Sequence, residues 1–235
     1  MHQNSAMQTK SSILAQNKTY FIGLLLALIS GVIFLLINGK TIAFVSLNAY
    51  HPFLLNAFFI NYTFMGDGIF ALCLVAATFF YYKKKEQGWA YLYAFLISAF
   101  VVQLIKNLVD APRPRLFFEA GQYLHFIDGV SLANNSSFPS GHTATAFAIA
   151  TVMVMMMKDK TMQLFILIAA ILVGYSRIYL AQHFLLDVMI GAFIGSTSGI
   201  VAFYLAQNMI RIKRSFKKMH RLSRGAASSP AIQTV

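Results

Sequence analysis

The sequence predicts an all-α, polytopic membrane protein with six transmembrane helices. Of its 235 residues, 58% are hydrophobic and only 11% are charged. A soluble domain carries a charge on about a quarter of its residues, so this composition is typical of an integral membrane protein. The apolar residues are also gathered into long runs, and a helix needs about 20 of them to cross a bilayer.

Six runs approach this length, the fourth of them being short. A further apolar stretch, 47–63, is expected to form a short helix in the membrane interface. Asp67 follows it and is expected to cap or hydrate a helix end, although it could also reach a site. The six expected spans are 20–38, 64–82, 89–109, 142–157, 161–180 and 184–209.

The basic residues predict the orientation of these spans. They precede span one and follow spans two, four and six, so they share one side of an even-numbered bundle, which is the cytoplasmic side by the positive-inside rule. The net charge of +12 is concentrated after the last span, which indicates a membrane-flanking tail rather than a nucleic-acid surface. The expected parts are a cytoplasmic tail over 1–17, a six-helix domain over 18–210 and a basic cytoplasmic tail over 211–235.

Three polar clusters interrupt the apolar pattern. The first is "KNLVDAPRPR" at 106–115. Proline cannot continue a helix, so Pro112 and Pro114 hold Arg113 on a rigid, extended turn. Interfacial snorkelling of Lys106 and Arg113 would not require this fixed placement.

The second cluster is "PSGH" at 139–142. Ser140 suits the N-cap of a helix, and Gly141 allows a ligand to approach the backbone. The free N–H groups of such a helix end form an anion site, from which His142 would project. Alone, the cluster is equally compatible with a plain N-cap followed by an interfacial histidine.

The third cluster is "SRIYLAQHFLLD" at 176–187, which begins with Ser176 and Arg177. His183 and Asp187 are four residues apart and share one face of a helix. The carboxylate can bind one imidazole nitrogen and leave the other free as a base or nucleophile. A histidine–aspartate pair that merely links helices is the alternative.

The predicted topology brings all three clusters to the outer side of the membrane. One site would then hold three cations, a helix N-terminus, two histidines and a carboxylate. Guanidinium and ammonium groups bind phosphate oxygens, and two histidines could attack phosphorus and protonate the leaving oxygen. The spacing typical of metal ligands is absent from the sequence, so neither a metal nor another cofactor is expected.

In order and spacing, the clusters resemble the tripartite signature of the type 2 phosphatidic acid phosphatase (PAP2) superfamily. This resemblance implies a PAP2-like helical bundle and a metal-independent membrane phosphatase acting on lipid phosphates or diphosphates. It implies that His183 is the nucleophile that becomes phosphohistidine, that Asp187 orients it, and that His142 is the acid. The phosphate would be held by Lys106, Arg113, Ser140, Gly141 and Arg177. Asp110 and Arg115 lie within or beside the first motif and have no assigned role.

Several functional questions stay open at this level. The resemblance covers undecaprenyl diphosphate, phosphatidylglycerol phosphate, phosphatidic acid and lipid A phosphates as substrates, and a lipid phosphotransferase is a close alternative. A non-catalytic lipid-phosphate carrier would use the same cations, but it would need neither His142 nor the His183–Asp187 pair. The expected partners are therefore the bilayer and a lipid phosphate, and the small size suggests a bacterial inner-membrane enzyme.

Overall fold

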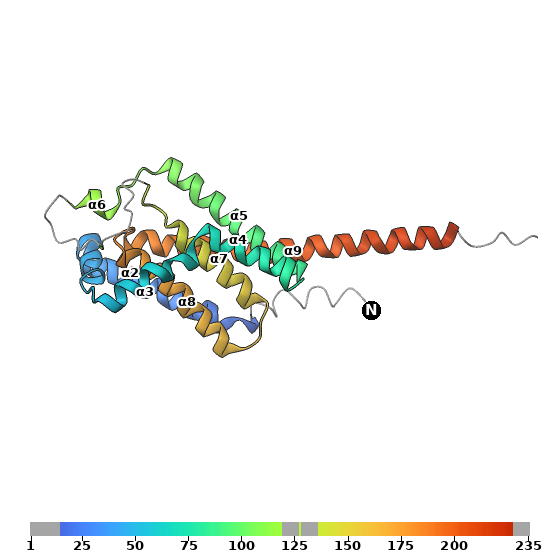
Figure 1. The fold of residues 1–235 in the computed structure, drawn as a ribbon, viewed down its shortest axis with the longest axis horizontal. Coiled ribbons are helices and arrows are strands. Elements are labelled where there is room, and N and C mark those ends of the chain that lie inside the picture. Colours follow the sequence, from blue (N-terminus) through green and yellow to red (C-terminus); the bar gives the residue numbers. More distant parts are fainter. Residues whose placement is uncertain (1–14, 119–126, 128–135, 228–235) are drawn as a thin grey trace, which may run out of the picture.

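The computed structural model describes residues 15–118, 127 and 136–227, and these residues form helices without any β-strand (Figure 1). The helices, in chain order, are α2 (Lys18–Leu47), α3 (Phe53–Tyr62), the 3-10 helix η1 (Thr63–Gly66), α4 (Gly68–Ala76), the π-helical turn η2 (Ala77–Tyr81), α5 (Lys85–Leu108), α6 (Pro114–Phe117), α7 (Gly141–Met155), α8 (Lys160–Tyr179) and α9 (Leu185–Ala227). The all-helical fold class is confirmed. Parts of the expected tails 1–17 and 211–235, and most of the loop after α6, lie outside the described residues.

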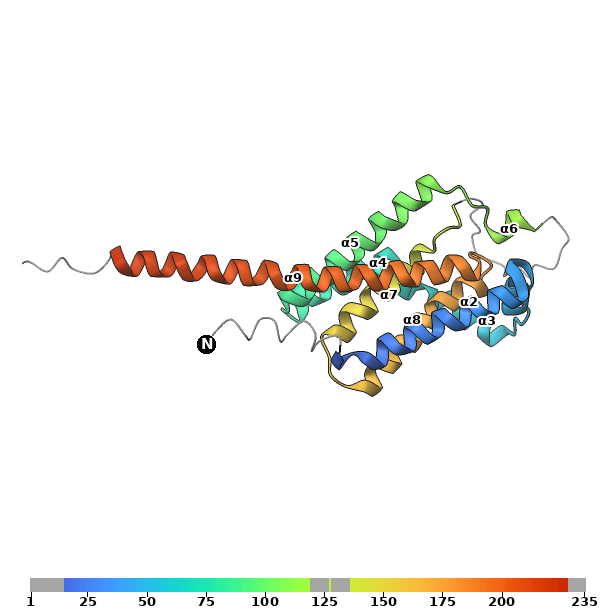
Figure 2. The same ribbon diagram turned by 180° about the vertical axis from the view of Figure 1, so that it is seen from behind.

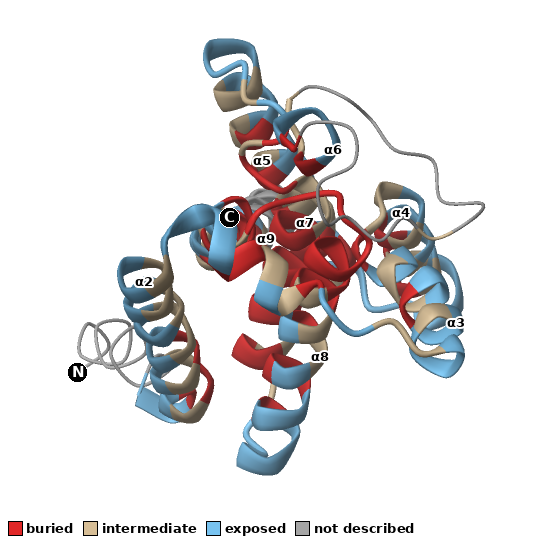
Figure 3. Cartoon of the chain, turned by 90° about the vertical axis from the view of Figure 1, so that its left-hand side faces the viewer, coloured by how far each residue is buried: buried red, intermediate tan, exposed pale blue. Residues whose placement is uncertain are grey.

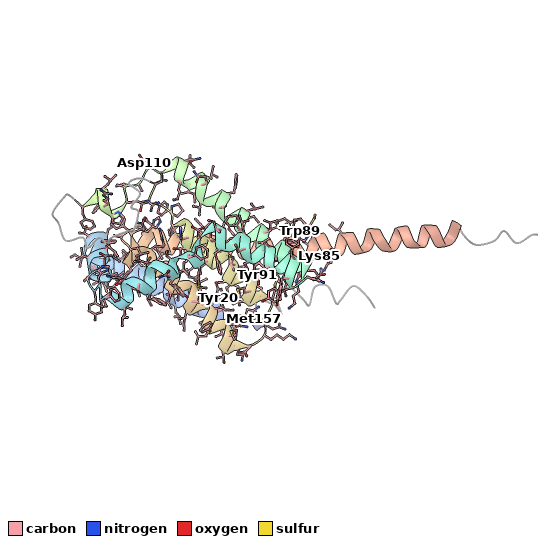
Figure 4. The ribbon with its side chains drawn as sticks, viewed as in Figure 1. Tyr20, Lys85, Trp89, Tyr91, Asp110 and Met157 are labelled. Carbon is pink, nitrogen blue, oxygen red and sulfur yellow. The ribbon has the colours of Figure 1, made fainter. Side chains whose placement is uncertain are left out.

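The long helices run up and down along one common direction, as the views from both sides show (Figures 1 and 2). Asp110, just beyond the end of α5, lies at the end of the helical bundle opposite to Lys85 and Trp89, which stand at the start of that helix (Figure 4). The C-terminal end of α8 and the N-terminal ends of α7 and α9 lie at the same end as Asp110. The chain direction therefore brings all three polar clusters to one end of the bundle.

Helix α7 is the central helix, and nearly all of its residues are buried (Figure 3). It packs closely against α9 because α9 has glycine at every fourth position along the contact, namely Gly191, Gly195 and Gly199. A Cβ atom at Gly191 would lie 2.6 Å from the carbonyl oxygen of Ser140, and one at Gly199 would lie 2.7 Å from that of Ala148. Small residues at this spacing let helix backbones approach one another in membranes. The contact fixes the start of α7 beside the start of α9.

The expected count of six spans is not confirmed. Within the described residues, four helices are long and apolar enough to cross a membrane, namely α2, α5, α8 and α9 up to Ile212. Helix α7 has only 15 residues, so its burial inside the bundle, rather than its length, makes it part of the membrane domain. Helix α9 also continues to Ala227, well beyond the expected end of the sixth span at 209.

The expected second span is the broken element of the bundle. The segment Phe53–Gly66 and the segment Gly68–Tyr81 qualify as a span only together, and they are bent by 59° where they meet. The stretch expected as a separate interfacial helix, 47–63, therefore belongs with this bent pair, and its helix α3 begins only at Phe53. The break falls at Asp67, whose extended backbone separates η1 from α4.

Candidate active site

A buried histidine–aspartate pair joins the end of α8 to the start of α9. His183 is 2% exposed and Asp187 is 5% exposed. The Nδ1 atom of His183 lies 3.6 Å from Oδ2 of Asp187, a distance longer than a hydrogen bond. That Nδ1 atom has no hydrogen-bond partner among the described residues. The two side chains are therefore adjacent but not hydrogen-bonded to each other, which is common in active sites before substrate binds.

Local backbone geometry fixes this pair. Asp187 is the third residue of α9, and its Oδ2 accepts a hydrogen bond from the backbone N–H of Phe184 (3.0 Å). This is the returning half of a capping box. The same oxygen accepts from the hydroxyl of Ser137 (2.5 Å). On the other side, the N–H of His183 donates to the carbonyl of Arg177 (3.1 Å). Helix α8 therefore ends in a tight turn that presents the histidine.

The start of α7 lies directly against this pair. Ser140 is the N-cap residue by position, as expected, but its side chain makes no capping hydrogen bond. Its hydroxyl instead accepts from the hydroxyl of Thr143 (2.9 Å), and its backbone N–H donates to the carbonyl of Asp187 (3.0 Å). The N–H groups that follow, from Gly141 and His142, begin the helix at the site. A helix N-terminus of this kind favours an anion.

Two arginines come from separate elements. Arg113 follows Pro112, and its Nη1 donates to the side-chain oxygen of Gln182 (2.8 Å), one residue before His183. Arg177 is 8% exposed, and its Nη1 donates to the hydroxyl of Thr63 (2.7 Å). Its Nε is buried and has no hydrogen-bond partner among the described residues. Burying a charged donor without a partner is costly.

Lys106 completes the set of cations. It lies in the last turn of α5, where the charges of Arg113, Arg177 and Asp187 act on it. It lines a cavity of about 220 Å³ together with Gly141 and His142. The structure thus brings all eight sequence-predicted site residues to one end of the bundle.

Burial sets the protonation of the site residues that lie outside the spans. It lowers the pKa of the Arg113 guanidinium, although the nearby Asp187 opposes this change; a guanidinium nevertheless stays charged. Burial also lowers the pKa of His183, and the charges of Arg177 and Arg113 lower it further, against the effect of Asp187. The lowered pKa favours the neutral form of the His183 imidazole.

His142 faces a carboxylate from outside the three clusters. Its Nε2 lies 3.6 Å from Oδ2 of Asp67, while Oδ1 of Asp67 accepts from the N–H of Ile69 (2.7 Å) and caps α4. The sequence-based expectation of a helix cap is therefore met, and the same side chain also reaches the site.

Sequence reasoning missed three polar residues of the site, namely Thr63, Ser137 and Gln182. Thr63 lies in an apolar stretch with no local signal. Ser137 and Gln182 stand beside motif residues, and a neighbouring position is the only sequence signal that they carry. Asp110 and Arg115, which had no assigned role, are exposed.

The donor atoms of the site do not resemble a metal centre. Within the described part of the chain, no group of three or more histidine, cysteine, aspartate or glutamate side chains is arranged to hold a metal ion. The carboxylates of Asp67 and Asp187 each face a different histidine.

Known proteins resemble both the sequence and the fold. The PAP2 superfamily model matches residues 87–211. The chain is 30% identical to phosphatidylglycerophosphatase B of Bacillus subtilis over 179 residues, which are 70% of this chain and 80% of that protein. It is 31% identical to the lipid A 4'-phosphatase of Bacteroides thetaiotaomicron over 72 residues, which are about a third of each protein.

Two solved structures share the fold. The crystal structure of Aquifex aeolicus LpxE superimposes with a TM-score of 0.59 and 31% identity, covering 68% of this chain and 92% of that one. A transmembrane PAP2-type phosphatidylglycerolphosphate phosphatase from Bacillus subtilis superimposes with a TM-score of 0.56 at 24% identity, covering 81% and 95%. The second likeness concerns the fold alone.

Proposed function

The chain belongs to the PAP2 superfamily, and on this premise we propose that it removes a phosphate group from a membrane lipid through a phosphohistidine intermediate, without a metal ion. The relatives named above are lipid phosphatases, and the apolar helices make this chain an integral membrane protein. The mechanism and the roles of single residues go beyond that kinship, and the geometry of the site supports them.

One observation carries the proposal. The buried guanidinium of Arg177 has an Nε atom without a hydrogen-bond partner in the described structure, and it acts on the same histidines as Arg113. With Lys106, this makes three cations around the buried His183–Asp187 pair. An arrangement with this excess of positive charge favours a multiply charged anion with several oxygen acceptors. A phosphate monoester or diphosphate at the head of a lipid has this chemistry.

In the first step, His183 attacks phosphorus. Its Nδ1 faces Asp187, so the lone pair on Nε2 forms the new P–N bond. The bond between phosphorus and the lipid oxygen breaks, and that oxygen takes its proton from His142. Lys106, Arg113 and Arg177 bind the phosphoryl oxygens with the helix N-terminus at Ser140 and Gly141.

In the second step, water cleaves the phosphohistidine. The water oxygen bonds to phosphorus, the P–N bond breaks, and His142 accepts the proton of the water. The sum is one lipid phosphate and one water converted to one lipid alcohol and one inorganic phosphate. The three cations supply the positive charge that metal ions supply in a metallophosphatase.

The substrate approaches from the bilayer at the outer face. We place both termini in the cytoplasm because basic residues gather at the end of the bundle away from the site, as the positive-inside rule requires. Lys85 begins α5 at that end (Figure 4), directly after Lys83 and Lys84, and Lys158 belongs to the connection from α7 to α8. In a bacterial inner membrane the site would then face the periplasm, where the four candidate lipid classes can present their phosphates.

The proposal is tested by assaying purified protein for release of inorganic phosphate from each lipid class. The panel is undecaprenyl diphosphate, phosphatidylglycerol phosphate, phosphatidic acid and a lipid A phosphate, all in the same detergent. At least one substrate should release phosphate, and His183→Ala should abolish that release. Binding of all four without release would identify a carrier and contradict the proposal, as would transfer of the phosphate to an added lipid alcohol without hydrolysis.

A further inference from the structure

The break in the bent pair brings a carboxylate to the active site from outside the three clusters. Asp67 lies between η1 and α4, and its Oδ2 lies 3.6 Å from Nε2 of His142. Both side chains are partly exposed, to 36% for Asp67 and 31% for His142, so they line an accessible space rather than a sealed core. We propose that Asp67 is a positioning residue that orients His142 for its role as the acid, an inference that rests on the proposed function.

The approach of the two side chains is fixed by packing. At Gly66, a Cβ atom would lie 2.7 Å from the carbonyl oxygen of His142 and 2.9 Å from its Cβ atom. The only residue that fits there is therefore glycine, and the backbone next to Asp67 is in contact with the start of α7. On the other side of η1, Thr63 binds Arg177. The short helix η1 is thus held against two of the site residues.

Helix capping accounts for only one of the two carboxylate oxygens of Asp67. Its Oδ1 accepts from Ile69 and caps α4, which serine, threonine or asparagine would do as well. Asp159 shows a cap without this second function, because its Oδ1 binds both Thr161 and Met162 at the start of α8. At Asp67, the second carboxylate oxygen faces an imidazole nitrogen. A capping role does not require that contact.

The charged groups around His142 explain why a carboxylate beside it matters. The charged and titratable groups that act on His142 are Arg177, Arg113, His183 and Asp67, and Lys106 lines the same cavity. The cations oppose a positive charge on the ring of His142, yet the acid must carry a proton to give away. Asp67 is the carboxylate that acts against them at His142, whereas Asp187 faces His183.

The geometry also assigns the two nitrogens of His142. With Nε2–H directed at Asp67, Nδ1 is the atom that gives its proton to the leaving lipid oxygen. The ring is then left neutral with its remaining proton on Nε2, and Nδ1 accepts the proton of the attacking water in the second step. This resembles the way in which a carboxylate fixes the tautomer of a catalytic histidine.

The test uses Asp67→Asn, which keeps a good helix cap and removes the charge. Asp67→Ser is a second variant that also keeps the cap, and Asp159→Asn is the matched control that neutralises a capping carboxylate away from the site. With the best lipid of the panel, both Asp67 variants should lower kcat by roughly 10-fold or more, as expected for impaired acid catalysis, with KM nearly unchanged. The burst of p-nitrophenol from p-nitrophenyl phosphate should be spared, since this leaving group needs no proton. Asp159→Asn should behave as the wild type.

A double-mutant cycle distinguishes positioning from a structural role. If Asp67 acts through His142, adding Asp67→Asn to His142→Ala should cause no further loss of kcat. Additive losses, or equal losses with the lipid and with p-nitrophenyl phosphate, would overturn the inference. If His142→Ala itself loses both activities equally, the role of His142 in the proposed function fails. If His142→Ala loses activity with the lipid alone, but the Asp67 variants lose it equally with the lipid and with p-nitrophenyl phosphate, only the role of Asp67 fails.

Discussion

The backbone N–H of Ser140 donates a hydrogen bond to the carbonyl oxygen of Asp187 at 3.0 Å. This bond joins the residue that precedes α7 to the first turn of α9, although 47 positions separate the two residues in the sequence. It holds the N-terminal end of α7 against the residue whose carboxylate faces His183. Two motifs that look separate in the sequence are therefore one rigid unit.

Removing the hydroxyl that supports Asp187 should slow catalysis. Ser137 donates to Oδ2 of Asp187, and a hydrogen bond to a charged group contributes about 1.5–3 kcal/mol. Ser137→Ala should therefore lower kcat by roughly 10- to 100-fold, because the carboxylate loses its fixed orientation toward His183. Steady-state kinetics of the purified variant measure this. The control is Ser98→Ala, which removes a hydroxyl that donates to the carbonyl of Phe95 within α5; equal effects of the two variants would contradict the assigned role of Ser137.

The pH dependence should reflect a histidine that stays neutral in acid. Burial and the arginines lower the pKa of His183 below its usual value of about 6.5. A nucleophile with a lowered pKa is deprotonated, and therefore active, over the whole range above that pKa. The acid limb of kcat/KM that belongs to His183 should lie below about pH 6. Because a phosphate monoester itself titrates near pH 6, the substrate is titrated by phosphorus NMR in the same micelles. An additional inflection of the enzyme near 6.5 on the acid limb would count against this account.

Chelation should leave the enzyme active. In the proposed mechanism Lys106, Arg113 and Arg177 balance the charge of the phosphate, so EDTA should not change the rate of phosphate release. Vanadate adopts a five-coordinate geometry like that of phosphorus in transfer and should inhibit. Loss of activity in EDTA that magnesium restores would mean that a metal ion carries the charge instead.

The orientation in the membrane can be tested by cysteine labelling. In a Cys73→Ser background, Asp110→Cys should react with an impermeant thiol reagent in intact cells, whereas Lys158→Cys should react only after the membrane is opened. Both positions are exposed, so accessibility depends on the side of the membrane. The reverse pattern would put the site on the cytoplasmic face.

The fold class could be predicted from the sequence because long apolar runs suit few structures other than membrane helices. The count of spans could not be predicted in this way. Hydropathy does not reveal that α3 with η1 and α4 with η2 form a bent pair, or that α7 is a short, buried helix. The extension of α9 beyond 209 was missed because the polar residues that follow the span are compatible with a helix as well as a tail.

The eight expected site residues could be named because each stands in a polar cluster within an apolar background. Thr63 and Asp67 are different, since their contribution depends on how η1 packs against α7 and α8. The contact between Gly66 and His142 joins positions 76 residues apart, and local sequence patterns carry no information about such a distance. Asp67 could be interpreted as a cap, and the cap is present, but its second oxygen is explained only by the tertiary structure.

The central claim is that His183 attacks phosphorus while His142 protonates the leaving oxygen, and the pre-steady-state burst of p-nitrophenol tests it most directly. A lipid alkoxide leaves poorly without a proton, so His142→Ala should lose about 10²–10⁴-fold on a lipid substrate. On p-nitrophenyl phosphate, His142→Ala should retain a burst, because p-nitrophenolate needs no acid, even if slow hydrolysis of the phosphohistidine limits later turnovers. His183→Ala should show no burst with any substrate. A burst in His183→Ala would place the nucleophile elsewhere and contradict the assignment of both histidines.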